Sequence, residues 1–277
     1  MDNHAIAAVV VLYYPNSSVL NNIKSYADKV SKLYIVDNTD NEVSHKQILD
    51  TFLNAEVLHK GENIGIAKAL NIALECARSD GYAWLLTMDQ DTSFPNNGFI
   101  QFFQHFKVLI KEKDSVAIYT PLHNKKFLQN NLYLPYKQVK YVMSSANIVN
   151  IAKALSVGGY EERFFIDEVD HEFCFRIRSS GYTIWEDNTI AVSHQLGEKY
   201  NNRTLYNAVR LYYMTRNYLY LKRDYYDDDP DFFQNRDRYL RKFFLQQILY
   251  GKKRIYNFYM ISIGVLDFIL NHVGKKR

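Results

Sequence analysis

The sequence has few cysteines and no hydrophobic run long enough to cross a membrane. Cys76 and Cys174 are the only cysteines in 277 residues, and their spacing matches no metal-binding or redox motif. We therefore expect two reduced thiols and no disulfide, which is typical of a cytoplasmic protein. The first apolar run, residues 5–14, is far shorter than a transmembrane helix, and residues 1–8 lack the positive charge that opens a secretion signal.

The sequence also lacks a glycine-rich, basic loop after its first apolar run. Residues 13–16 read Tyr-Tyr-Pro-Asn, whereas a nucleotidyltransferase of similar fold would bind its triphosphate in such a loop. From Lys199 onward there are 16 Lys and Arg against 7 Asp and Glu, on segments predicted to be helical. A nucleic-acid-binding protein would instead interleave basic and aromatic residues along a sheet or groove. We expect no nucleic-acid partner, and a non-catalytic nucleotide- or nucleic-acid-binding protein stays as the alternative from a different class.

Apolar runs alternate with amphipathic segments along the first part of the chain. The apolar residues between Ile66 and Ala77 fall on one face of a helix. Strands that alternate with helices predict an α/β fold with a doubly wound, mostly parallel sheet of the Rossmann-like type. A ligand binds such a sheet at the carboxyl ends of its strands. The predicted strands are residues 6–13, 33–36, 56–59 and 82–88, with a further helix after Ser17 that extends to Val30.

Each of these four strands is followed by polar or turn-forming residues. Pro, Asn, Asp and Gly are ordinary turn and cap residues, which is a sufficient explanation for any one turn. Four such turns at one edge of a parallel sheet instead indicate a crevice for a ligand. In chain order the turns contain Tyr14 and Pro15, Asp37 and Asn38, Asn63 and Gly65, and Asp89 with Asp91.

Two acidic clusters could carry chemistry. Asp89 and Asp91 are two residues apart directly after a strand, so both carboxylates can bind one Mg²⁺ or Mn²⁺ together with diphosphate oxygens, although short acidic turns also occur without a metal. Residues 167–172 read as the start of a helix, where acidic side chains favour the helix dipole. The same carboxylates could accept a proton from an attacking hydroxyl. His194 stands alone and is either structural or a ligand.

Taken in order, these motifs resemble the bacterial family 2 glycosyltransferases, in particular their rhamnosyltransferase branch. The resemblance spans about residues 5–225, and its order and spacing are more specific than any single motif. The motifs are residues 35–38, 61–71, 89–91, 165–176 and 194–197, followed by the branch's downstream signature at residues 210–213 and 215–217.

The resemblance implies a GT-A catalytic domain over residues 1–225 that transfers a sugar with inversion and needs Mg²⁺ or Mn²⁺. The implied donor is dTDP-L-rhamnose, with UDP-galactofuranose or another UDP-hexose as the alternative. The implied acceptor is a glycan, lipid-linked, in bacterial cell-surface polysaccharide biosynthesis such as that of O-antigen or capsule. No residue separates the donors by a physical argument, and the sequence does not identify the acceptor linkage.

The resemblance also implies roles for individual residues. Asp170 falls at the position of the general base. Val169 stands where many family members have Glu, so Asp167 is a possible substitute. The loop with Ser144 and Asn147 would approach the acceptor. The implied metal ligands are Asp91, Asp89 and His194. The implied donor-binding residues are Tyr14, Pro15, Asp37, Asn38, Asn63, Gly65 and Asp89, with Arg210 and Arg216 as candidates for phosphates or as members of a solvated helix face.

The last part of the chain, residues 226–277, reads as a basic helical extension after the polar break at residues 227–230. Three basic residues precede the apolar stretch 255–270, which Asn257 and Asp267 interrupt, and three more basic residues follow it. This pattern predicts an amphipathic helix that lies on an anionic membrane surface. The protein would then be a peripheral protein on the cytoplasmic face of the inner membrane. The alternative is a helix that packs on the catalytic domain or on a second subunit in a homodimer.

Overall fold

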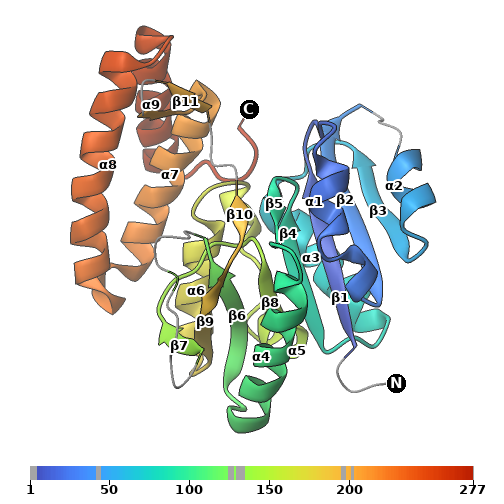
Figure 1. The fold of residues 1–277 in the computed structure, drawn as a ribbon. Coiled ribbons are helices and arrows are strands. Elements are labelled where there is room, and N and C mark those ends of the chain that lie inside the picture. Colours follow the sequence, from blue (N-terminus) through green and yellow to red (C-terminus); the bar gives the residue numbers. More distant parts are fainter. Residues whose placement is uncertain are drawn as a thin grey trace. The chain divides into compact units, whose positions relative to one another are not determined.

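The computed structural model describes residues 5–41, 45–123, 128, 135–194, 198–200 and 203–276 (Figure 1). The chain divides into two compact units. Unit 1 comprises Met1–Glu161 and Phe173–Gln195, and unit 2 comprises Glu162–Glu172 and Leu196–Arg277. The division therefore lies upstream of the boundary expected at residue 225, and unit 2 includes a short segment taken from the middle of the chain.

Unit 1 is built on an eight-stranded sheet with strand order β3-β2-β1-β4-β8-β6-β9-β7. Six strands run parallel to one another, while β8 and β7 run antiparallel to their neighbours. The sheet is thus mostly parallel, as predicted. Its strands are β1 (Ile6–Leu12), β2 (Lys32–Asp40), β3 (Ala55–Gly61), β4 (Trp84–Asp89), β6 (Val116–Leu122), β7 (Tyr136–Val139), β8 (Asn147–Asn150) and β9 (Thr183–Ala191).

Helices cover both faces of this sheet (Figure 1). All seven residues of β1 are buried, which is typical of a parallel strand between two helical layers. Alternate β1 residues pack with α1, α2 and α4 in one core cluster, while α3 packs on the opposite side against β1, β2 and β4. The helices are α1 (Val19–Lys24), α2 (Lys46–Thr51), α3 (Ile66–Ser79), α4 (Gly98–Glu112), α5 (Ile151–Ser156) and α6 (Val169–Ser179) from Phe173 onward, with the 3₁₀ turn η1 (Ala27–Lys29). The 3₁₀ turn η3 (Glu162–Phe164) and the first turn of α6 belong to unit 2.

Two predicted boundaries in unit 1 differ from the structure. The helix expected to reach Val30 ends at Lys24, where the Ser25 hydroxyl bonds the Asn22 carbonyl, and the chain continues as η1. β2 continues through Asp37 and Asn38, which were expected in a turn. The Asp37 carboxylate accepts from the Thr39 amide at 2.7 Å, so polar residues are accommodated within the strand.

Unit 2 consists of three long helices, α7 (Ala208–Tyr225), α8 (Pro230–Tyr250) and α9 (Arg254–Ile269), with the 3₁₀ turn η4 (Tyr226–Asp228) and the hairpin of β11 (Glu198–Tyr200) and β12 (Arg203–Leu205). Asp229 caps α8 by accepting from the Phe232 amide, and Pro230 occupies the first turn. The predicted polar break thus starts a helix as well as ending one. Within the described residues, no helix is both long and apolar enough to span a membrane.

Candidate active site

The carboxyl end of β4 carries the first acidic cluster. β4 ends at Asp89, and Asp91 precedes the two-residue strand β5 (Thr92–Ser93). β5 pairs with β10 (Ser193–His194), which sets His194 opposite Thr92. The Nε2 atom of His194 lies 3.2 Å from Asp91 Oδ1 and 3.9 Å from Asp89 Oδ2. The structure therefore brings together the three residues that the resemblance implied as metal ligands.

This cluster has the geometry and donor chemistry of a divalent metal site. One ligand atom from each residue lies within 4.8 Å of the other two. Ligands bound at about 2.1 Å stand up to about 4.2 Å apart, so a small closure would suffice. The side chains of Asp89 and Asp91 are 32% and 40% exposed, whereas that of His194 is 5% exposed. Two accessible carboxylates and one imidazole leave room for further oxygen ligands from a substrate.

Ser145 fixes the backbone beneath this cluster. Its hydroxyl accepts from the Asp89 amide at 3.0 Å and donates to Thr92 Oγ1 at 2.9 Å, and the side chain is fully buried. Sequence reasoning assigned residues 144–147 to the acceptor and missed this role. His123 was also missed: its ring lies 5.7 Å from that of His194, and burial together with His194 lowers the His123 pKa to about 4.

Gln90, between the two aspartates, anchors the loop after β1. Its side-chain amide accepts from the Tyr13 amide and donates to the Tyr13 carbonyl, both at 2.9 Å. The Tyr14 amide donates to Thr39 Oγ1 at 2.8 Å, and Tyr14 has a φ of 44°. The rings of Tyr13 and Tyr14 are exposed and meet edge to face at 4.7 Å, and Pro15 follows half-buried. The loop that was predicted to bind the donor is therefore held by backbone contacts that leave both rings at the surface.

The ends of β2 and β3 bring the other predicted donor residues to the start of α3. The Asn38 Oδ1 atom accepts from the Ile64 amide at 3.2 Å, and Asn63 Oδ1 accepts from the Gly65 amide at 3.0 Å. Gly65 has a φ of 84°, a conformation that favours glycine. The Asp37 carboxylate is buried and lies 2.6 Å from His45 Nε2. Contact of these residues with a nucleotide stays a prediction.

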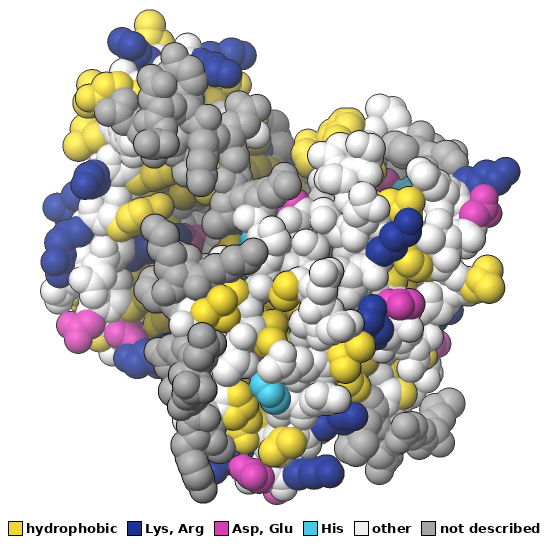
Figure 2. All heavy atoms as spheres, in the orientation of Figure 1, with side chains coloured by type: hydrophobic (Ala, Val, Ile, Leu, Met, Phe, Trp, Pro, Cys, Tyr) yellow, Lys and Arg dark blue, Asp and Glu magenta, His cyan; other side chains and the backbone are white. Residues whose placement is uncertain are grey.

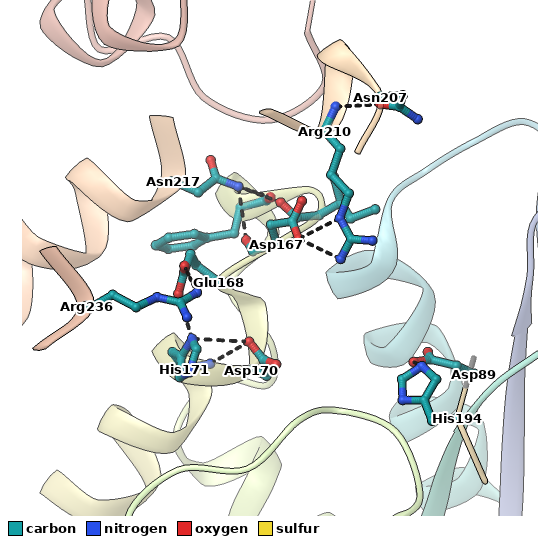
Figure 3. A network of polar contacts seen from close by, with 12 residues as sticks. Asp89, Asp167, Glu168, Asp170, His171, His194, Asn207, Arg210, Asn217 and Arg236 are labelled. Carbon is teal, nitrogen blue, oxygen red and sulfur yellow. Dashed lines mark hydrogen bonds and ion pairs between the residues drawn. The ribbon is translucent and has the colours of Figure 1, made fainter. Parts of the chain in front are cut away.

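The second acidic cluster lies in unit 2, on a loop with unusual backbone geometry (Figure 3). Phe165, Asp167 and Glu168 have φ values of 46°, 61° and 62°. Such left-handed conformations cost about 1–3 kcal/mol each for residues other than glycine. The Asn217 side-chain amide of α7 offsets this cost by donating to the carbonyls of Phe164, Ile166 and Asp167 at 2.6, 2.6 and 3.1 Å.

Glu168 is locked between two cationic groups. Its carboxylate lies 2.6 Å from Arg236 Nη2 and 2.6 Å from His171 Nδ1, and its side chain is 1% exposed. Burial alone would raise the Glu168 pKa, but the charges and hydrogen bonds of His171 and Arg236 lower it to about 2. Burial likewise opposes the charged form of His171, and the neighbouring Glu168 and Asp170 outweigh it and raise the His171 pKa.

Asp167 and Asp170 differ in how their carboxylates are occupied. Asp167 Oδ1 accepts from Arg210 Nε and Nη2 at 3.2 and 3.0 Å, and its Oδ2 is buried with no hydrogen bond among the described residues. Burial raises the Asp167 pKa to about 6 although Arg210 opposes the rise. Asp170 is more exposed and accepts from the His171 amide at 2.9 Å. Of the two carboxylates, Asp170 is the one more accessible to a substrate.

The two arginines that were predicted to bind phosphate have different surroundings. Arg210 is half-exposed, pairs with Asp167 and lies over the Tyr206 ring at 4.3 Å. Arg216 is 1% exposed, and its guanidinium donates to Tyr212 Oη, Asn217 Oδ1 and the Gly274 carbonyl. A guanidinium with these partners inside unit 2 does not form a solvated helix face, and contact of Arg210 or Arg216 with a phosphate stays a prediction.

Comparison with known proteins agrees with this geometry. A sequence model of glycosyl transferase family 2 matches residues 9–148. The chain belongs to glycosyltransferase family 2. It is 27% identical over 244 residues to "dTDP-rhamnosyl transferase RfbF" of Shigella flexneri, covering 80% of this chain and 81% of the relative.

Two solved glycosyltransferases share the GT-A fold of this family 2 chain. The structure of GalNAc-T7 with UDP, GalNAc and Mn²⁺ has a TM-score of 0.60 at 12% identity, covering 97% of this chain and 58% of that chain. The chain thus spans less than two thirds of the GalNAc-T7 structure. TarS of S. aureus in complex with UDP-GlcNAc has a TM-score of 0.57 at 14% identity, covering 97% and 81%. At these identities the likeness concerns the fold alone.

The family 2 match covers the acidic turn but ends before the second cluster and His194. Of the residues that sequence reasoning missed, Asn217 had a signal, because it belongs to the downstream signature in which only the arginine received a role. Ser145, Gln90 and His123 had none, since each acts through backbone or ring contacts with residues far away in the sequence.

Proposed function

We propose that this family 2 glycosyltransferase is a metal-dependent, inverting rhamnosyltransferase that moves L-rhamnose from dTDP-L-rhamnose to a glycan acceptor in cell-surface polysaccharide synthesis. The observation that carries this proposal is the 27% identity to a dTDP-rhamnosyl transferase over most of both chains. That alignment is long enough to include much more than the nucleotide-binding half. A UDP-sugar donor is the competing possibility, supported by the UDP-bound structures that share the fold.

Asp89, Asp91 and His194 are the proposed metal ligands. A bound divalent cation would offset the charge of the departing nucleoside diphosphate. Imidazole is a better ligand for Mn²⁺ than for the harder Mg²⁺, so the mixed donor set favours Mn²⁺. Ser145 would hold the Asp89 backbone in place as the carboxylates close on the ion.

Asp170 is the proposed general base. It would accept the proton of the acceptor hydroxyl as the hydroxyl oxygen bonds the anomeric carbon and the bond from that carbon to the diphosphate oxygen breaks. Attack opposite the leaving group inverts the anomeric centre. Asp170 is preferred to Asp167 because Asp167 Oδ1 is paired with Arg210 and its Oδ2 is buried.

Donor binding provides the first test. We would measure calorimetric binding of dTDP-L-rhamnose, UDP-galactofuranose, UDP-galactose and UDP-glucose with Mn²⁺, Mg²⁺ or EDTA. We expect dTDP-L-rhamnose to bind best, in the presence of metal, and Asp91→Ala to lose the metal-dependent part. Asp50→Ala, an exposed aspartate on α2, is the matched control and should bind as the unaltered chain does.

The product and the competing donors complete this test. NMR of the product should show the anomeric configuration opposite to that of the donor. If the chain bound a UDP-sugar better than dTDP-L-rhamnose, the proposed donor would be wrong, but the proposed glycosyl transfer would stand. Equal binding with and without metal in both the unaltered chain and Asp91→Ala would refute the metal site.

A further inference from the structure

The outer face of α9 is exposed, mostly apolar and uncharged. Ile255 is 87% exposed, and the residues that follow it at helical spacing are also largely exposed. We call this surface the outer face of α9; its main members are Ile255, Phe258, Tyr259, Val265, Leu266 and Ile269. Large exposed apolar faces of this kind mark sites of interaction.

The opposite side of α9 is fixed against unit 2. Asn257, Met260 and Gly264 are buried, and a Cβ atom at Gly264 would lie 2.8 Å from the Tyr212 carbonyl of α7. The Asn257 amide donates to the Gln247 carbonyl at 3.0 Å, and Asp267 accepts from Tyr212 Oη at 2.6 Å. Asn257 and Asp267, two of the polar residues of this stretch, therefore both face inward. The exposed Ser262, whose hydroxyl donates to the Phe258 carbonyl at 3.0 Å, is the polar residue on the outer side.

A basic corner stands at the start of this face. Lys252, Lys253 and Arg254 join α8 to α9 and are exposed. Gly251 makes the corner tight, because a Cβ atom there would lie 2.3 Å from the Gln247 carbonyl and 2.4 Å from the Asn257 amide nitrogen. Residues 238–266 contain six Lys and Arg and no Asp or Glu. The basic corner and the outer face of α9 are thus next to each other.

On the visible face of unit 2, acidic side chains lie near one end of α8. In Figure 2 they lie near its lower end, whereas basic side chains occur along its outer side and, with hydrophobic ones, near its upper end. Between residue 226 and the end of α8 at Tyr250, the acidic residues are Asp227, Asp228, Asp229, Asp231 and Asp237, all in or before the first half of α8.

We propose that the outer face of α9 and the basic corner dock on an anionic phospholipid bilayer, with α9 lying in the plane of the membrane surface. A helix with an apolar face and basic residues at its end suits the boundary between acyl chains and anionic headgroups. Tyr256 and Tyr259, whose rings stack at 6.2 Å, are amphipathic side chains favoured at that boundary. Residues 238–266 contain six Lys and Arg and no Asp or Glu, so the charge beside this face is complementary to anionic headgroups.

Vesicle flotation of the full chain tests this proposal. Vesicles of equal parts phosphatidylcholine and phosphatidylglycerol should bind the chain, and vesicles of phosphatidylcholine alone should bind it far more weakly. Replacing Lys252, Lys253 and Arg254 together by Ala should lower binding to the anionic vesicles on the order of 100-fold. Lys111→Ala with Lys113→Ala, an exposed basic pair at the end of α4, is the control and should have little effect.

A second variant tests the apolar face separately from the charge. Ile255→Glu should lower vesicle binding about 10- to 100-fold because a buried apolar contact is replaced by a charge. Leu53→Glu makes the same change at a position that is 96% exposed in unit 1 and should leave binding unchanged. Unaltered thermal unfolding of both variants would show that the fold is intact.

Three results would overturn the proposal. The first is equal binding to anionic and neutral vesicles, and the second is unchanged binding in both the basic-corner variant and Ile255→Glu. The third is a stable dimer in sedimentation velocity that Ile255→Glu dissociates, without vesicle binding by the unaltered chain. That result would assign the outer face of α9 to a second copy.

Discussion

Two acidic clusters in this glycosyltransferase use the same residue types in opposite ways. In unit 1, Asp89 and Asp91 are partly exposed and share a histidine whose nitrogen can itself bind a metal. In unit 2, Asp167 and Glu168 are buried against Arg210 and Arg236. The acidic residues of the first cluster are arranged to accept an external cation, whereas those of the second already have cations from the protein. Asp170 differs from both, because no arginine pairs with it among the described contacts and its cationic neighbour is His171, whose Nδ1 lies 3.7 Å from Asp170 Oδ1.

Replacing the accessible carboxylate of unit 2 should have the largest effect on catalysis. Asp170→Asn keeps the size of the side chain but cannot accept the proton, so we expect turnover to fall about 10²- to 10⁴-fold with donor affinity retained. Steady-state kinetics together with calorimetric donor binding would measure the two separately.

The matched variant Asp167→Asn tests whether Asp170, and not Asp167, is the general base. It should lower stability by weakening the contact with Arg210 and should reduce turnover less than Asp170→Asn. If Asp167→Asn were inactive with normal stability while Asp170→Asn stayed active, the roles of the two aspartates would be exchanged.

Removing one of the two cationic partners of Glu168 should mainly lower the free energy of unfolding. Arg236→Ala leaves Glu168 buried without one of its two cationic partners, and removing one member of a buried pair costs about 3–5 kcal/mol. Urea unfolding would measure the change. Arg238→Ala, on the same helix but exposed, is the control and should change stability little. A small effect of Arg236→Ala would mean that the second cluster is not held by its ion pairs.

A smaller effect is expected beneath the metal cluster. Ser145→Ala removes the hydrogen bond to the Asp89 amide, and loss of a contact behind a metal ligand weakens metal affinity about 10- to 100-fold. Metal titration of donor binding would detect this change. Ser79→Ala, at an exposed serine that bonds only its own helix, should leave metal affinity unchanged. Wild-type affinity in Ser145→Ala would show that the backbone needs no such anchor.

The smallest expected effect is the pH dependence of stability. Because the folded Glu168 pKa of about 2 lies below the ordinary value of 4.5, its stabilising contribution is present above pH 4.5 and is lost as the pH falls toward 2. The His171 pKa is raised above 6.5, so its contribution is present below pH 6.5 and is lost as the pH rises through the folded pKa. Thermal unfolding between pH 5 and pH 9, near the ordinary His pKa, should show this alkaline loss, and His171→Asn should abolish it. An unchanged alkaline slope in His171→Asn would assign the loss to another group.

The sequence predicted those features that depend on local patterns. The continuous apolar run of β1 and the helical periodicity of α3 identified the start of the sheet, and Asp89 with Asp91 identified its acidic edge. Such features follow from residues close together in the chain, which is why composition and spacing suffice for them.

Features that depend on distant partners could not be predicted in the same way. His194 reaches the cluster through the pairing of two strands of only two residues each, which leaves no period in the sequence. Arg216 is buried, and one of its hydrogen-bond acceptors, the Gly274 carbonyl, is 58 residues away in the sequence. The extension of β2 through Asp37 and Asn38 was missed because polar residues after a strand are usually part of a turn.

The hydrogen bonds of the Asn217 side-chain amide affect the order in which parts of the chain can fold. It holds three carbonyls of the acidic loop, of which the nearest in sequence is 50 residues earlier. During synthesis on a ribosome the loop therefore emerges well before the group that stabilises its left-handed residues. Asp89, Asp91 and His194 all precede Asn217, so the proposed metal ligands are complete in the nascent chain while the loop that leads into α6 and Asp170 still awaits α7.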